Sequence, residues 1–269
     1  MNHDQIEKEP LVANLPVEPV RLRETRIIMG MPVTIDTSDA RALQADIDAV
    51  FDYFTAVDAR FSTYKDTSEI SRINRGEIVE EEYSDEMRDV FRLAEETKRD
   101  TNGYFDIHRV DGTIDPSGVV KGWAIRNAAQ VLSDLGYRHF YVDAGGDIQT
   151  RGNNSDGGEW SVGIRNPFDI QQIVKVVYPH GMGIATSGTY IRGQHIYNPH
   201  APEDELSDIV SLTVIGPDVF EADRYATAAF AMGTDGVTFI ERLPGFEAYE
   251  INAKGIARMT SGFPRYTRV

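Results

Sequence analysis

Apolar side chains recur at helical spacing in five stretches of the chain. In the first of them, Leu43, Ile47 and Val50 follow one another at intervals of three or four residues, which places them on one face of an amphipathic helix. The helices predicted in this way cover residues 40–57, 85–98, 124–135, 222–232 and 235–243. Ser84 is a candidate N-cap of the second helix, and Gly136 is placed to end the third in the left-handed conformation.

Strand-like segments occupy much of the remaining chain. They are short runs rich in β-branched and aromatic residues, bounded by turn-forming residues. The predicted strands cover residues 27–35, 140–143, 160–164, 173–178 and 209–215, and a closing hairpin joins residues 246–252 to 255–259. Helices and strands intermix without a regular βα repeat, so we predict an α+β fold with mixed or mostly antiparallel sheets and packed helices.

The domain organisation follows from composition. Residues 1–20 contain three prolines and little apolar periodicity, which predicts a flexible N-terminal tail. Residues 21–269 show no internal repeat, low-complexity tract or clear linker, so we expect one domain. Because 41% of the chain is hydrophobic, a domain of this length can bury a large core.

The formal net charge of −16 narrows the classes of partner. It disfavours binding to nucleic acids and to anionic membranes. An anionic small molecule would need local cations, a helix N-terminus or a metal ion to offset the surrounding field. No stretch reaches the roughly 18 consecutive apolar residues of a membrane span.

The chain contains no cysteine, which excludes disulfides, thiolate metal sites and lipid attachment at an N-terminal cysteine. Its polar, acidic beginning does not resemble a signal peptide. We therefore expect a cytoplasmic protein. The alternative is a secreted protein whose leader has been removed.

The segment from Asp115 to Gly122 carries the first candidate chemistry. Its glycines, Gly118 and Gly122, allow a ligand to approach the backbone closely. Lys121 offers a cation for a diphosphate, and a helix expected to begin here could direct free N–H groups at a phosphate. The alternative is structural: Ser117 caps a helix, the glycines permit tight packing, and the lysine is solvated. Short glycine patterns do not decide between the two.

A carboxylate and a hydroxyl lie one helical turn apart at Asp223 and Thr227. Such hard oxygen donors suit Mg²⁺, which usually completes its coordination with waters and substrate phosphates. The alternative is that the Thr227 hydroxyl bonds back to the helix carbonyl four residues earlier, while Asp223 favours the helix dipole.

Five further segments combine turn residues with polar or aromatic side chains. Asp143 to Asp147 is a Gly-Gly turn between aspartates, and Gly183 to Gly188 is either a close-packed pocket wall or a turn. His195 lies in a polar loop and has the side chain best suited to proton transfer near neutral pH. Tyr64 and the segment 102–106 offer aromatic rings for a ligand or for packing.

Taken in order, these segments resemble the ApbE family, the FAD:protein FMN transferases. The resemblance extends over residues 24–260. It is carried by Met29 to Met31, Phe61 to Asn74, Gly103 to Asp106, Asp115 to Gly122, Ala144 to Asp147, Val162 to Arg165, Ala185 to Gly188, His195 to Pro199 and Asp223 to Thr227.

The resemblance implies a role for each matched residue. The positions expected to contact FAD are Met29, Tyr64, Tyr104, Phe105, Asp106, Asp115, Lys121, Ile196 and Tyr197. The positions expected to bind the metal are the backbone carbonyl of Gly118 and the side chains of Asp223 and Thr227. His195 matches the family histidine that acts as the base.

The chain departs from the family pattern at a few positions. It has Asn198 where aspartate is common, Ala201-Pro202 where Thr-Gly is common, and Ala226 where some members carry an additional acidic ligand. These changes fall in or near the segments that would surround the reacting groups.

The function implied by the resemblance is Mg²⁺-dependent transfer of FMN from FAD to a threonine hydroxyl of a target protein, with release of AMP. An FAD diphosphatase, in which water replaces the threonine, and a non-enzymatic flavin-binding protein are the alternatives. The chain has no Ser-Gly-Ala-Thr acceptor motif of its own, so we expect the acceptor to be a separate protein.

Overall fold

The computed structural model describes residues 21–188, 196–203 and 206–268. The predicted tail and His195 lie outside these residues. An eight-stranded sheet with the order β1-β2-β3-β4-β7-β8-β9-β10 runs through the structure, and β5 and β6 form a separate two-stranded sheet. Every strand pair in the described residues is antiparallel, which confirms the predicted α+β class.

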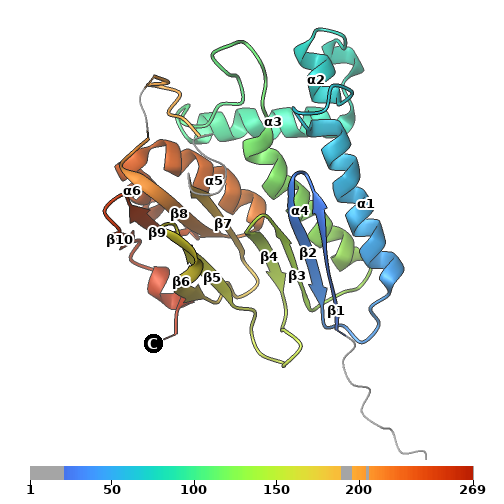
Figure 1. Ribbon diagram of the computed structural model, residues 1–269, viewed down its shortest axis with the longest axis vertical. Coiled ribbons are helices and arrows are strands. Elements are labelled where there is room, and N and C mark those ends of the chain that lie inside the picture. Colours follow the sequence, from blue (N-terminus) through green and yellow to red (C-terminus); the bar gives the residue numbers. More distant parts are fainter. Residues whose placement is uncertain (1–20, 189–195, 204–205, 269) are drawn as a thin grey trace, which may run out of the picture.

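The element bounds are as follows. The strands are β1 (Leu22–Ile28), β2 (Met31–Thr37), β3 (Phe140–Ala144), β4 (Asp147–Arg151), β5 (Val162–Asn166), β6 (Asp169–Val177), β7 (Gly183–Gly188), β8 (Ile209–Gly216), β9 (Glu247–Asn252) and β10 (Ala257–Met259). The α-helices are α1 (Gln44–Phe61), α2 (Glu69–Asn74), α3 (Asp85–Asp100), α4 (Ser117–Asp134), α5 (Val219–Ala231) and α6 (Gly236–Glu241). Figure 1 shows α1 and α4 beside the strands β1 to β4, and α5 and α6 beside the strands that follow.

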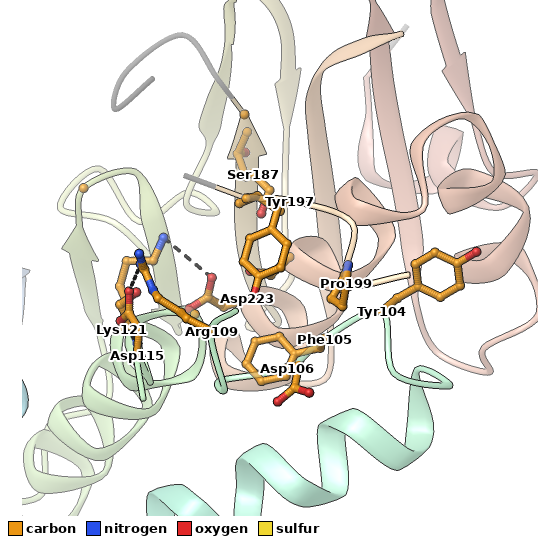
Figure 2. Close-up of a pocket in the computed structure, with 17 residues that line it drawn as sticks. Tyr104, Phe105, Asp106, Arg109, Asp115, Lys121, Ser187, Tyr197, Pro199 and Asp223 are labelled. Carbon is orange, nitrogen blue, oxygen red and sulfur yellow. Dashed lines mark hydrogen bonds and ion pairs between the residues drawn. The ribbon is translucent and has the colours of Figure 1, made fainter. Parts of the chain in front are cut away.

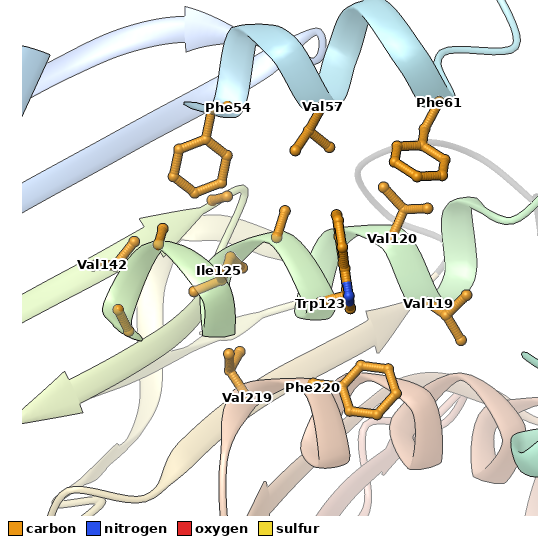
Figure 3. Packing of buried hydrophobic residues seen from close by; sticks show 14 of the residues in the cluster. Phe54, Val57, Phe61, Val119, Val120, Trp123, Ile125, Val142, Val219 and Phe220 are labelled. Atoms are coloured by element: carbon orange, nitrogen blue, oxygen red, sulfur yellow. The ribbon is translucent and has the colours of Figure 1, made fainter. Parts of the chain in front are cut away.

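The largest apolar cluster surrounds α4. Figure 3 shows this helix between α1 and α5, with Phe54 and Phe61 reaching it from one side and Phe220 from the other. Trp123 lies at the centre of this layer and is only 4% exposed. Burying one such aromatic side chain stabilises a fold by about 1.5–3 kcal/mol. The helix that carries the candidate ligand segment is therefore held firmly on two sides.

The second half of the large sheet is covered on both faces. Ala185 and Leu212 face α5 and α6, whereas Ile184 and Ile215 face the β5–β6 sheet and Phe263. Neighbouring residues of a strand point to opposite faces, so a strand buried on both faces lacks the alternation that marks a half-exposed strand. Among the described residues, no helix is both long and apolar enough to cross a membrane.

The predicted strand over residues 27–35 is wrong, because the chain reverses within it. Met29 and Gly30 have positive φ angles of 55° and 70° and form the two-residue loop between β1 and β2. Paired positive φ values match the right-handed twist of a hairpin. Methionine is not a residue type that usually marks a turn. The apolar residues on either side of Met29 were therefore predicted to form one continuous strand.

Two helices begin earlier than predicted. Helix α4 begins at Ser117 rather than at residue 124, so Gly118 and Gly122 belong to its first turns and do not form a separate turn. Helix α5 begins at Val219, where Asp218 caps it by accepting a hydrogen bond from the Glu221 N–H. The predicted caps at Ser84 and Gly136 are confirmed.

The strands β4 and β7 were not predicted as strands. Segment 183–188 is rich in small residues because α5 packs directly on it. A side chain at Gly183 would place its Cβ 1.9 Å from the Val219 nitrogen. The small residues are required by α5, which is distant in sequence. From the sequence alone, a run of small residues is equally typical of a turn.

Helices α4 and α5 approach closely at Gly122. A Cβ at this position would lie 2.7 Å from the Asp223 Cβ and 2.9 Å from the Phe220 Cα. The Gly122 N–H donates a hydrogen bond of 2.8 Å to Asp223 Oδ2. This contact places the start of one helix against the acidic residue of the other.

We expect Gly122→Ala to lower the free energy of unfolding by about 1–3 kcal/mol, because the added methyl group has no space between the two helices. Denaturant-induced unfolding followed by circular dichroism measures the loss. Gly158→Ala is the matched control, since the nearest atom to its Cβ would be 3.6 Å away. Equal stability of the two variants would contradict this account of the helix contact.

Candidate functional site

A cleft opens where the N-terminus of α4, the end of β7 and the segment 196–199 meet (Figure 2). The cleft and its open mouth together span about 1040 Å³ of space. The residues that line it are Tyr104, Phe105, Asp106, Arg109, Asp115, Ser117, Gly118, Lys121, Gly145, Thr186, Ser187, Gly188, Ile196, Tyr197, Pro199, Asp223 and Thr227. Most residues expected to contact FAD or metal are therefore brought to one place.

The N-terminus of α4 forms one wall of the cleft. Asp115 Oδ1 accepts a hydrogen bond of 3.0 Å from the Ser117 N–H, which orders the entry to the helix. The other carboxylate oxygen of Asp115 forms an ion pair with Arg109. Figure 2 shows this pair beside Lys121. An 18-residue helix that begins at a cleft directs the positive end of its dipole there.

Lys121 binds two buried carboxylates. Its ammonium group contacts Asp147 Oδ2 and lies 3.6 Å from Asp223 Oδ1. Asp147 and Asp223 are 1% and 3% exposed, so both charges are removed from water. The structural alternative of a solvated lysine is wrong, because the Lys121 side chain is only 17% exposed.

Each of these carboxylates is also fixed by a backbone donor. Asp147 Oδ1 accepts a hydrogen bond of 3.0 Å from the Thr186 N–H, and Asp223 Oδ2 accepts that of Gly122. Burial raises the pKa of Asp223; Lys121 opposes this rise, and Asp147 adds to it. In the protein without bound ligands, Asp223 therefore holds a proton to higher pH than an exposed aspartate.

The oxygen donors near Asp223 fit a magnesium ion. Gly118 and Thr227 are neighbours, since a Cβ on Gly118 would lie 3.5 Å from Thr227 Cγ2. The Thr227 hydroxyl makes no hydrogen bond to the Asp223 carbonyl within the described residues, whereas Thr55 does bond back to Phe51, at 3.0 Å. The Thr227 hydroxyl oxygen is therefore available to a metal ion. The Gly118 carbonyl oxygen has two lone pairs, so it can accept a helix hydrogen bond and also bind a metal ion.

This donor set has a single carboxylate and otherwise neutral oxygens. Across the part of the chain that the structure describes, no three histidine or acidic side chains gather around one point. Mg²⁺ tolerates such a set because it commonly keeps waters and binds substrate phosphates. A zinc-like site, which needs several histidine ligands, would not fit these residues.

The aromatic residues of segment 102–106 differ in orientation. Phe105 is buried at the cleft wall, and a Cβ on Gly118 would lie 2.9 Å from its ring. Asp106 binds Lys98 of α3 at 2.7 Å, and Figure 2 shows it directed away from Lys121. Tyr104 packs against His200, with 4.6 Å between the ring centroids.

The segment after His195 is anchored to this wall. The Tyr197 hydroxyl donates to the His108 carbonyl at 3.3 Å, and His200 Nε2 lies 2.9 Å from the Asn102 carbonyl. Asn198 Oδ1 accepts the His200 N–H at 2.9 Å. Asn198, one of the departures from the family pattern, thus closes a local turn.

Two predicted FAD contacts do not line the cleft. Met29 lies in the β1–β2 turn, partly buried against the first apolar cluster, and Tyr64 is 97% exposed in the loop between α1 and α2. Their roles stay predictions. Ala226 is fully buried in the apolar cluster between α5 and the sheet.

Sequence reasoning missed Arg109, which lines the cleft, and gave no individual role to Asp147, which lies behind the cleft wall. Arg109 lies in an irregular loop whose ends meet at a bridge between His108 and Ile114, and no local pattern marks it. Asp147 was noted only as part of a turn, although its neighbour Gly145 lines the cleft. The sequence signal that could have indicated Asp147 is the two-glycine hairpin turn in which Ala144 pairs with Asp147.

Residues 29–110 and 108–250 match the model of the ApbE family. The chain therefore belongs to the ApbE family, as the order of its motifs predicted.

Curated relatives carry the name FAD:protein FMN transferase. The proteins of Escherichia coli (strain K12) and Salmonella typhimurium are each 30% identical over 162 residues, which is 57% of this chain and 46% of the relative. The chain thus matches about half the length of these relatives.

Solved structures share the fold. The flavin transferase ApbE from Vibrio cholerae has a TM-score of 0.80 at 22% identity, covering 92% of this chain and 99% of its own. The ApbE protein from Thermotoga maritima has a TM-score of 0.81 at 21% identity, covering 93% and 100%.

We expect Asp223→Asn to remove a pH dependence of stability, measured in chelator. The native carboxyl group holds its proton to higher pH than the unfolded chain does, so unfolding releases a proton in that window and stability falls as pH rises through it. The free energy of unfolding of the variant, relative to the unsubstituted protein, should therefore increase between about pH 4 and about pH 7. The exposed Asp52→Asn is the control. A constant difference between Asp223→Asn and the unsubstituted protein would contradict the burial argument.

Proposed function

We propose that this protein transfers FMN from FAD to a threonine hydroxyl of a target protein, with Mg²⁺ as the metal and AMP as the leaving group. The observation that carries the proposal is the meeting of the α4 N-terminus, Lys121, Asp223 and Thr227 in one cleft of an ApbE-family fold. The names of the relatives support the same activity.

The cleft offers separate surfaces to the parts of FAD. Tyr197 presents aromatic surface that suits a planar ring system. The positive end of the α4 dipole, together with Lys121 and Arg109, suits the diphosphate. Lys121 and Arg109 are both paired with carboxylates, so a divalent cation would supply the further positive charge that an anionic substrate needs in a protein with a net charge of −16.

Asp223, Thr227 and the Gly118 carbonyl would hold the metal in this proposal. A bound Mg²⁺ would act as a Lewis acid that stabilises negative charge developing on the phosphate oxygens. Asp223 is oriented for this role by the Gly122 N–H, and Gly118 by the packing of α4 on α5. The two helices thus present their oxygen donors in a fixed arrangement before any ligand arrives.

The reaction breaks one bond and forms one. The acceptor hydroxyl oxygen attacks the phosphorus on the FMN side of the diphosphate, and the bond from that phosphorus to the bridging oxygen breaks, so that AMP leaves. His195 takes the hydroxyl proton. It lies outside the described residues, and its neighbour Ile196 lines the cleft.

Incubation with FAD, Mg²⁺ and a threonine-containing candidate acceptor, followed by intact-mass measurement, tests the proposal. We expect the acceptor to gain the mass of one FMN unit and AMP to be released in equal amount. The same acceptor with its threonine replaced by valine should gain nothing. FMN and AMP without an adduct would instead identify an FAD diphosphatase, with water as the nucleophile.

Asp223→Ala should abolish turnover in this assay, because the proposed metal site loses its carboxylate. Full activity of that variant would remove Asp223 from the metal site.

His195→Ala should bind FAD normally but transfer FMN more slowly by about 10²–10⁴-fold, because a general base contributes a factor of this size. FAD fluorescence titration measures binding, and the mass assay measures transfer. His180→Ala is the matched control, since this exposed histidine pairs with Glu159 and does not line the cleft. Unchanged transfer by His195→Ala would assign the base to another group.

A further inference from the structure

One ammonium group serves two buried carboxylates on different elements. Lys121 of α4 contacts Asp147 at the start of β4 and also lies 3.6 Å from Asp223 of α5. Both carboxylates are almost fully buried, so each requires a compensating charge. With both carboxyl groups ionised, as a bound cation would require, two negative charges and one positive charge leave this group one positive charge short of balance.

The carboxylates are fixed, and the lysine is the member that can move. Backbone N–H groups of Thr186 and Gly122 hold Asp147 and Asp223 in place. The ammonium lies at the end of a flexible four-carbon stem. Asp147 does not line the cleft, whereas Asp223 does. The lysine is thus bound on one side by a carboxylate behind the cleft wall and on the other by a carboxylate that faces the ligand.

We propose that Lys121 is the resident counter-cation of the metal-free site, that a divalent cation replaces it as the partner of Asp223, and that Asp147 is the positioning residue that then retains the ammonium. This inference rests on the proposed metal site at Asp223. It adds a role for Asp147, which the metal and substrate assignments do not use.

The charges predict opposite effects of Lys121 and Asp147 on the affinity for a divalent cation. Without Lys121, Asp147 and Asp223 would repel each other, and a divalent cation would be attracted more strongly. Without Asp147, the ammonium would pair with Asp223 alone and would oppose metal binding there. Arg109 lines the same cleft but is paired with Asp115, so it should have little influence on the metal.

Titration of the flavin-free protein with Mg²⁺ alone, followed calorimetrically at one pH, tests the proposal. We expect Lys121→Met to bind Mg²⁺ about tenfold more tightly than the unsubstituted protein, and Asp147→Asn about tenfold more weakly. Arg109→Met, which also removes one positive charge from the cleft, should change the affinity by less than about twofold. Equal effects of Lys121→Met and Arg109→Met would overturn the proposal, because general electrostatics would then account for both.

Thermal unfolding provides a second measurement if a variant is unstable. Lys121→Met should unfold at lower temperature in chelator and gain more from added Mg²⁺ than the unsubstituted protein gains. A loss of stability that Mg²⁺ does not reverse would mark a merely structural lysine and overturn the proposal.

The outcomes distinguish failure of the Lys121 role from failure of the metal site at Asp223. If the unsubstituted protein binds Mg²⁺, Asp223→Asn does not, and Lys121→Met binds no more tightly than the unsubstituted protein, the role of Lys121 fails while the metal site stands. If the unsubstituted protein binds no Mg²⁺, the metal assignment at Asp223 fails and this inference fails with it.

Discussion

The close contact between α4 and α5 is the constraint on which the site depends. Gly122 has no side chain, so the α5 backbone at Phe220 and the Asp223 side chain can approach α4 closely enough for the Gly122 N–H to bind that carboxylate. The same approach places Gly118 beside Thr227. The candidate metal ligands therefore come together through helix packing, and the apolar layer around Trp123 maintains that packing.

Burial of charge follows from this geometry. Asp147 and Asp223 lie in the interior, where unpaired carboxylates are costly, and both depend on backbone donors and on one lysine. In the proposed metal site, a cation that enters from the cleft would supply a further positive charge to this group. In the proposed function, the N-terminal end of α4 would face the diphosphate and Asp223 would bind the metal ion.

Much of the fold could be predicted from local pattern. Helix α3 and its Ser84 cap, the end of α4 at Gly136 and the strand β8 were recognisable because their periodicity and caps lie within a few residues. The early start of α4 could not be predicted, because two glycines near the beginning of this helix are typical of a loop. Strand β7 was hidden for a related reason: contact with α5 at Gly183 demands small residues, and small residues resemble a turn.

The sequence by itself determined the elements with clear periodicity, the acidic character and the ordered set of motifs that identifies the ApbE family. It also brought forward Asp115, Lys121, Asp223 and Thr227 as candidates. Only the tertiary structure decided that Lys121 binds Asp147 and Asp223 and that Arg109 lies in the cleft beside Asp115. The physical reason is that Lys121 is 26 residues from one partner and 102 from the other (147 − 121 and 223 − 121), and no local periodicity encodes which distant charges meet when helices and strands pack.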